Sequence, residues 1–421
     1  MIVLRIFGEM QKDKINIWWG PPRKFSRTFE ERKISWLELF YDLVYVIAIS
    51  KITFYFSQHF SLNGLLDYTY LFAMIFWGWL NGSLHHDIHG STGIRTNLMT
   101  LWQMMIVAAL VVTFGSPPET FLFNATVAVM AMQLFITYLW WSVGIYDKQH
   151  RILNRPYTIC FLISLGLMFI TLFAGTHWIR LLFYTSLLLN YLPPFLANRD
   201  AKAGGEVFIL SASMTERLGL FCIILFGEVV LGVVNGIASI HAFGWWTWVH
   251  FVLAILIVFS LWWIFFSMIA DRKCKTGFLK STLMSMVYIP AFMSLGVMGV
   301  AFSGLFADVR PEDPVSYRMR LAFGVSVAVF LGGIATLTYF LLYPEGYRKD
   351  KGKLVACLMV SALLFLVPVI FSLNISLFAF LLSGWVVLLL LILAISKSWL
   401  ALEVNKRVES ETGQLTKEDA L

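Results

Sequence analysis

Long apolar stretches constrain this chain more than any other feature of its sequence. Each has about the 20 residues that an α-helix needs to cross the roughly 30 Å hydrocarbon core of a bilayer. Only 14% of the 421 residues are charged, whereas a soluble domain carries roughly 25%. Backbone polar groups in lipid must be satisfied within their own segment, and the stretches lack the alternation of barrel strands. The sequence therefore predicts an all-α polytopic membrane protein of about twelve transmembrane helices. We expect spans at residues 34–56, 66–86, 98–115, 121–143, 157–175, 178–198, 214–238, 246–269, 281–306, 319–343, 353–371 and 375–397.

Basic residues are distributed unevenly between the segments that connect these spans. Most of the 32 Lys and Arg residues fall in the N-terminal arm, the even-numbered loops and the segment after the last span. Because cytoplasmic loops carry the excess of Lys and Arg, both termini are predicted to be cytoplasmic, with the protein in the plasma membrane. The loops account for the net charge of +7, so the expected surroundings are lipid and no nucleic-acid partner is expected. Residues 1–10 include Arg5 and Glu9 and precede no small-residue cleavage site, so no cleaved signal peptide is expected.

An internal repeat links the two halves of the chain at a spacing of 184 residues, from Trp79 to Trp263. Trp79, Ser83, Asp87, Thr92 and Gly93 recur as Trp263, Ser267, Asp271, Thr276 and Gly277. Six helices per half is an even number, so we expect two parallel six-helix repeats, an architecture of transporters and channels. The alternative is a chance similarity between apolar segments. We expect a cytoplasmic N-terminal arm at 1–33, a first repeat at 34–198, a cytoplasmic linker at 199–213, a second repeat at 214–397 and a cytoplasmic tail at 398–421.

The first predicted span contains ionisable residues, which are costly in lipid and therefore need a reason. Glu38 and Asp42 are four residues apart and so lie on one helix face, whereas Lys51 lies on nearly the opposite face. The first span of the second half contains Glu228, which aligns with Asp42 after two residues of slippage. Two acids from two halves could bind a cation or share a proton, because like charges held close oppose each other's ionisation.

Glu216 and Arg217 begin the span that contains Glu228, and at a helix start such residues often anchor the helix at the cytoplasmic interface. A second alternative is that Lys51, Arg217, or Trp and Tyr donors neutralise the acids, which then only lock helices together. Asp87 and Asp271 are expected at matching cytoplasmic helix ends, bonded to backbone N–H groups rather than to substrate.

Sequence motifs of metal sites and enzymes are weak or missing. The four cysteines are far apart, with no CxxC spacing, which argues against a disulfide framework or a zinc site. His85 and His89 are one helical turn apart, but zinc needs three or four ligands and the second half has no matching His. No P-loop, nucleophile elbow or HExxH motif is present. We therefore expect no metal, no cofactor and no enzyme activity. Pro290 and Pro368 interrupt apolar runs and are expected to kink their helices.

The chain resembles the bacterial low temperature requirement A family in two motifs. The first is the Trp-Leu-Glu-Leu-Phe-Tyr-Asp run at 36–42, and the second joins Glu216-Arg217 and 219–221 to Gly227-Glu228. The family name describes a cold-growth phenotype, so the resemblance implies a class of membrane protein and little mechanism. The 40–42 segment is also similar to the first-helix motif of the lysosomal potassium channel family, which implies a pore lined by the first and seventh helices. The 270–277 segment, by contrast, is similar to a loop motif of major facilitator carriers.

These patterns favour a channel or transporter for a small cation or an unknown solute. Its pathway residues would be Asp42, Glu228 and Glu38, with Glu216, Arg217 and Lys51 in support. A membrane enzyme acting on lipid or cell-wall precursors is an alternative, for which residues 85–89 would be the only polar cluster at an interface. A non-transporting sensor, scaffold or stress protein is another, although larger soluble domains would be expected. An oligomer is possible in each case.

Overall fold

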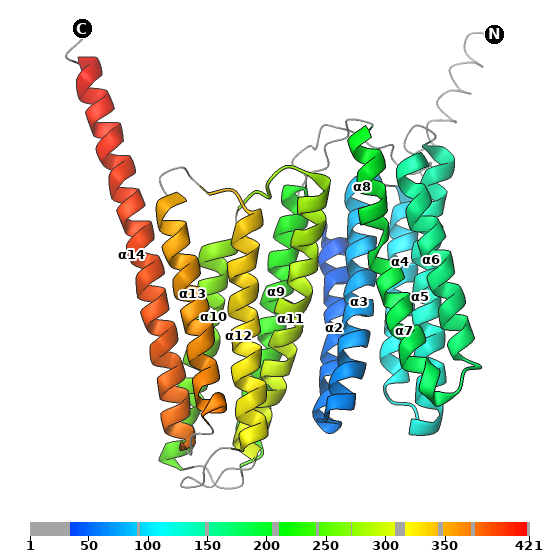
Figure 1. Ribbon diagram of the computed structural model, residues 1–421, viewed down its shortest axis with the longest axis horizontal. Coiled ribbons are helices and arrows are strands. Elements are labelled where there is room, and N and C mark those ends of the chain that lie inside the picture. The colour runs from blue at the N-terminus through cyan, green and yellow to red at the C-terminus, as the bar shows by residue number, and fades with distance from the viewer. Residues whose placement is uncertain are drawn as a thin grey trace. The chain divides into compact units, whose positions relative to one another are not determined.

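The computed structural model is helical through almost all of the chain that it describes. The described residues are 34–90, 93–147, 151–203, 210–240, 244–270, 272–307, 316–343, 348–371 and 375–418. Every element within them is a helix, and β structure is limited to isolated bridge residues such as the Cys274–Leu341 pair, so the all-α prediction is confirmed. The helices are α2 (Trp36–Gln58), α3 (Leu62–His89), α4 (Ile94–Thr113), α5 (Pro118–Tyr146), α6 (Arg151–Thr171), α7 (Thr176–Tyr191), α8 (Pro193–Ala203), α9 (Ala212–Ala238), α10 (Trp245–Ile269), α11 (Phe278–Ala307), α12 (Tyr317–Phe340), α13 (Arg348–Ile370) and α14 (Leu377–Glu418) (Figure 1).

Ten of these helices are long and apolar enough to cross a membrane, which agrees with a multi-pass membrane protein. Eleven of the twelve predicted spans each coincide with one described helix, but α3 and α7 are not among the ten helices. α3 has 28 residues and includes a polar stretch near its end, whereas α7 has only 16 residues. The sixth predicted span, 178–198, is divided between α7 and α8. The reason is chemical: Pro193 and Pro194 have no backbone N–H to donate to the helical ladder.

The chain divides into two compact units, described one at a time. The first comprises residues 1–224 and 276–283. In it α2 packs against α3 and α4, α4 against α5, and α5 against α6, while α3 contacts both α5 and α7. α6 packs against α7 and α8. The core of this unit is aromatic, with Trp77, Trp79, Tyr45 and Phe76 each at most 1% exposed.

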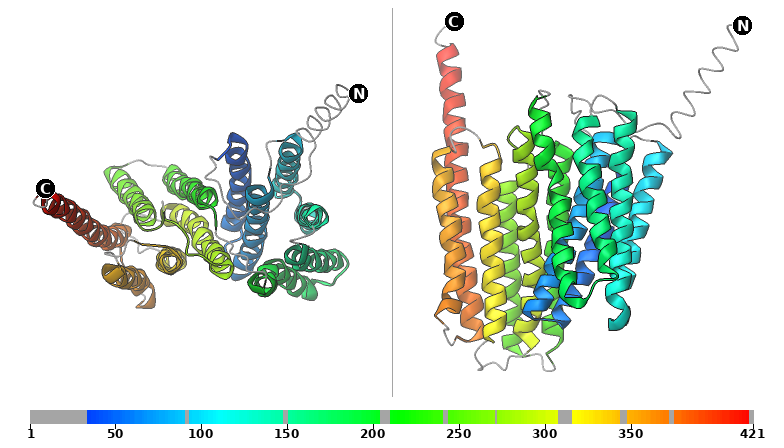
Figure 2. Two further views of the ribbon diagram at one scale, coloured as in Figure 1. Left: turned by 90° about the horizontal axis from the view of Figure 1, so that it is seen from above. Right: turned by 45° about the vertical axis from the view of Figure 1, so that its right-hand side comes forward.

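The second unit comprises residues 225–275 and 284–421. α10 packs against α12 and α14, α12 against α13, and α13 against α14, so these helices lie side by side in both views of Figure 2. α9 and α11 approach closely at Gly232, where an added Cβ would lie 2.2 Å from the Gly299 carbonyl oxygen. At Gly227, by contrast, an added Cβ would have no heavy atom within 4 Å. Of the two glycines that flank Glu228, only Gly232 therefore serves close helix packing.

Proline and glycine positions explain some local features. Pro290 lies inside α11 and Pro368 inside α13, and both helices continue through them. Gly277 has φ +131°, in the left-handed region that favours glycine, just before α11 begins. The side on which the termini lie remains a prediction.

Candidate intramembrane charge site

Glu38 is positioned by the start of α2. Ser35 caps this helix, and its hydroxyl accepts the Glu38 backbone N–H at 3.3 Å. In return the Glu38 carboxylate accepts the Ser35 backbone N–H and hydroxyl, each at 2.9 Å. This capping box follows from the Ser-x-x-Glu spacing, which was readable in the sequence. It fixes a carboxylate that is only 2% exposed in the first turn of the helix.

Asp42, one turn further along α2, forms the strongest contact of the site. Its Oδ1 accepts Arg217 Nη2 at 2.5 Å and its Oδ2 accepts Arg217 Nε at 3.1 Å. Trp79 Nε1 of α3 also donates to Oδ1, at 2.7 Å. Asp42 is 1% exposed and Arg217 is 2% exposed. A bidentate, buried pair therefore ties α2 to the start of α9, and the tryptophan adds α3.

Arg217 also contacts the second acid. Its Nη1 lies 3.5 Å from Glu38 Oε1, and His86 Nε2 of α3 lies 3.5 Å from the same oxygen. The guanidinium carbon is 5.6 Å from the ring centre of Tyr41 and 5.7 Å from that of Trp79, close enough for cation–π attraction. We call Glu38, Asp42 and Arg217 the charge cluster. It contains two carboxylates for one guanidinium, and a guanidinium stays protonated in proteins.

A layer of hydrogen-bonded polar groups lies next to the charge cluster. Gln103 Nε2 of α4 donates to the Tyr45 hydroxyl at 2.8 Å and to the Gly78 carbonyl at 3.2 Å. The Tyr41 hydroxyl donates to that same carbonyl at 3.5 Å. An added Cβ at Gly82 would lie 2.2 Å from the Tyr41 hydroxyl, so the layer depends on glycine at that position. Sequence reasoning missed Gln103, although a buried glutamine in an apolar span is itself a signal.

Among the predicted site residues, the structure brings Glu38, Asp42 and Arg217 together. The helix-start interpretation of Arg217 does not describe its position, because the side chain is buried against Asp42 instead of exposed at an interface. Glu216 and Lys51 are both exposed. Glu228 is partly exposed and belongs to the second unit, so its role in a shared pathway with Asp42 stays a prediction.

The two aspartates of the predicted repeat loops have different outcomes. Asp87 accepts the Ser213 hydroxyl at 2.7 Å, and the expected bonds from backbone N–H groups stay a prediction. Asp271 lies outside the described residues. The rings of His85 and His89 are 5.6 Å apart, between centroids. Across the residues described, no group of three His, Cys, Asp or Glu side chains is placed to hold a metal ion.

Comparison of the sequence with protein families gives a match. The sequence family described as bacterial low temperature requirement A protein (LtrA) matches residues 33–395, from just before α2 to well into α14. Neither the curated proteins nor the solved structures contain a match. The matched range includes all three residues of the charge cluster. It covers most of the chain, and the protein therefore belongs to the bacterial low temperature requirement A family.

Proposed function

We propose that this protein is a channel or transporter for a small cation or an unknown solute, and that the charge cluster is its intramembrane site. The observation that carries the proposal is the burial of two carboxylates, Glu38 and Asp42, one turn apart in a membrane-crossing helix and both in contact with Arg217. Carboxylates bind protons and metal cations, so two of them side by side can hold such an ion.

The cost of the cluster supports a functional role. Ionised side chains are costly in membrane helices, and this cluster buries three ionisable groups in the first two turns of α2 and α9. A pathway for cations gives these groups a purpose that packing alone does not. In the proposed cycle, a proton or cation that reaches the carboxylates weakens their hold on Arg217. α9 is then free to move relative to α2, which is the kind of two-state element that coupling requires.

We also propose that the chain consists of two parallel six-helix repeats. The contacts of α3 with α5 and α7 correspond by position to the contacts of α10 with α12 and α14, although α3 also contacts α2. The pairs α5–α6 and α6–α7 correspond in the same way to α12–α13 and α13–α14. Glu228 is then the counterpart of Asp42 and a second pathway acid. The halves are not identical at the site, since Trp79 is buried whereas Trp263 is 42% exposed.

A second candidate function is favoured by one specific observation. Both oxygens of Asp42 already accept hydrogen bonds from protein donors. A saturated carboxylate of this kind suits a helix lock in a non-transporting membrane protein. Only the first candidate, the channel or transporter, moves an ion across the membrane. A flux measurement therefore separates the two candidates.

The test is ion flux in proteoliposomes with a panel of H⁺, Na⁺ and K⁺. Asp42→Asn and Glu228→Gln should each abolish flux, because the amide removes the charge with little change in volume. Glu216→Gln is the matched control, since it removes an exposed acid beside Arg217 and should conduct normally. The helical content of every reconstituted variant should equal that of the wild type, so that a loss of flux is not a loss of fold. Normal flux in both Asp42→Asn and Glu228→Gln would contradict the proposal and favour the helix lock.

A further inference from the structure

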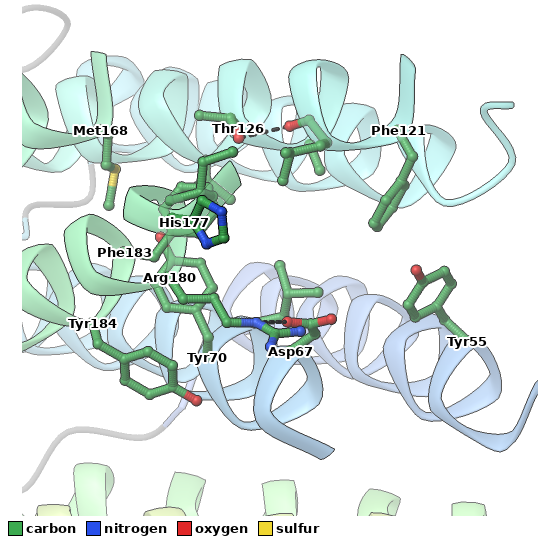
Figure 3. Close-up of a pocket in the computed structure, with 15 residues that line it drawn as sticks. Tyr55, Asp67, Tyr70, Phe121, Thr126, Met168, His177, Arg180, Phe183 and Tyr184 are labelled. Carbon is green, nitrogen blue, oxygen red and sulfur yellow. Dashed lines mark hydrogen bonds and ion pairs between the residues drawn. The ribbon is translucent and has the colours of Figure 1, made fainter. Parts of the chain in front are cut away.

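A pocket opens in the first unit at the end of the helices opposite the charge cluster. It has a volume of about 480 Å³ and lies where α2 and α6 end and α3, α5 and α7 begin. Asp42 is in the second turn of α2, whereas Tyr55 of the pocket is in its last turn. Figure 3 shows Phe121, Thr126 and Met168 along one side of the pocket, facing Tyr55 and Tyr70 along the other. The volume lies within the roughly 300–1,000 Å³ of small-molecule sites.

The walls of the pocket are aromatic and aliphatic. The ring of Tyr55 stacks on that of Phe121 at 4.9 Å between centroids, and the ring of Tyr70 stacks on that of Phe183 at 4.7 Å. Val129, deeper along α5, is 2% exposed. Such walls favour a ligand with an apolar, preferably flat, body that replaces water against the rings.

Two opposite charges lie together at the mouth. Arg180 Nε is 3.5 Å from Asp67 Oδ1, and the two side chains are 45% and 47% exposed. Arg180 Nη1 also donates to Asn63 Oδ1 at 2.8 Å. An exposed pair of this kind contributes little, so a ligand can take over its members at small cost. An amine would then meet Asp67 and an oxyacid would meet Arg180.

A buried polar group also faces the pocket. Tyr70 is 6% exposed, and its hydroxyl has no hydrogen-bond partner among the described residues. The Ser186 hydroxyl, which donates to the Phe183 carbonyl, lies close enough to interact weakly with the Tyr70 hydroxyl. Because buried hydroxyls are normally paired, a ligand that reaches the Tyr70 hydroxyl would gain a hydrogen bond there.

We propose that this pocket binds a zwitterionic amphiphile, a molecule with an amine and an oxyacid close together on an aromatic or aliphatic body. Both signs of charge at the mouth favour this ligand over a simple cation or anion, because a ligand of one sign would leave the other rim charge unanswered. Two sources share the chemistry: a free aromatic amino acid and a phosphatidylethanolamine headgroup with its acyl chains. The inference concerns binding alone and stands whether or not the charge cluster conducts.

The experiment uses the full chain, purified in detergent, with radiolabelled L-phenylalanine as the probe. Saturable binding is expected, with phenethylamine and 3-phenylpropionate competing about twofold to fivefold less well because each lacks one charge. A parallel arm reconstitutes the protein in nanodiscs of mixed phosphatidylethanolamine and phosphatidylglycerol and counts the retained lipid by mass spectrometry. Retention of phosphatidylethanolamine without phenylalanine binding identifies the lipid as the source, and the reverse identifies the solute.

Variants test the site itself. Ala125→Phe fills the pocket and should abolish binding, whereas Val127→Phe places the same aromatic ring at a position that is 44% exposed and should not. Tyr70→Phe should weaken binding about fivefold by removing one hydrogen bond. Asp67→Asn and Arg180→Gln alter only exposed groups, so they keep the test valid if Ala125→Phe does not fold. Wild-type binding by both rim variants, or retention of neither probe by the wild type, would overturn the proposal.

Discussion

Replacing Arg217 by methionine should destabilise the protein strongly, because it removes the guanidinium that pairs with buried Asp42 and contacts buried Glu38. Met has a similar length and no charge, so packing changes little while the bonds to Asp42 and Glu38 are lost. Removing one partner of a buried ion pair typically costs about 3–5 kcal/mol. The loss of Arg217 should cost a free energy in the upper part of that range, since the side chain is 2% exposed and contacts two acids.

The assay is reversible unfolding in SDS, followed by circular dichroism, on a set of four proteins. Wild type, Arg217→Met, Asp42→Asn and the double variant form a double-mutant cycle. The double variant should be less destabilised than the sum of the single changes, with a coupling of about 1–3 kcal/mol, because each single change leaves its buried partner charged and the double variant leaves neither.

Arg180→Met provides the matched control. Arg180 also pairs with an aspartate, but both side chains are close to half exposed, so its loss should cost no more than about 1 kcal/mol. Equal stability of Arg217→Met and the wild type, or additive effects in the cycle, would refute the conclusion that the buried pair holds α2 to α9.

Two further predictions concern helix packing and topology. Gly232→Ala should lower the free energy of unfolding by about 1–3 kcal/mol, because its methyl group would clash with the α11 backbone. Gly227→Ala is the control and should have no such cost. Equal effects of the two changes in the SDS assay would exclude the close approach as the cause. A Cys introduced at Asp313 should react with an impermeant thiol reagent added outside the cell, because the distribution of basic residues predicts that the 306–318 loop is external. A Cys introduced at Lys351 should not react. The opposite labelling would reverse the predicted orientation.

The helices themselves were determined by local sequence. Eleven of the twelve predicted spans each coincide with one helix because the requirement that lipid imposes, about 20 apolar residues with satisfied backbone groups, is met or failed within one segment. The acids of the first span were visible for the same reason, since a carboxylate in an apolar run stands out without knowledge of its neighbours. The break between α7 and α8 was equally local, and Pro193 with Pro194 could have predicted it.

The partners of those acids were decided by the tertiary structure. Asp42 and Arg217 are 175 residues apart, and neither hydropathy nor helical spacing says which faces of two helices meet. Sequence spacing showed only that Asp42 has no basic residue one turn away on its own helix. The pocket is a stronger case, because five helices contribute its walls and each contributes ordinary aromatic or aliphatic residues. Apolar patterning specifies that a side chain leaves water but not what it packs against. The sequence by itself therefore determined the spans and the charges within them. Only tertiary packing assembled the charge cluster and the pocket.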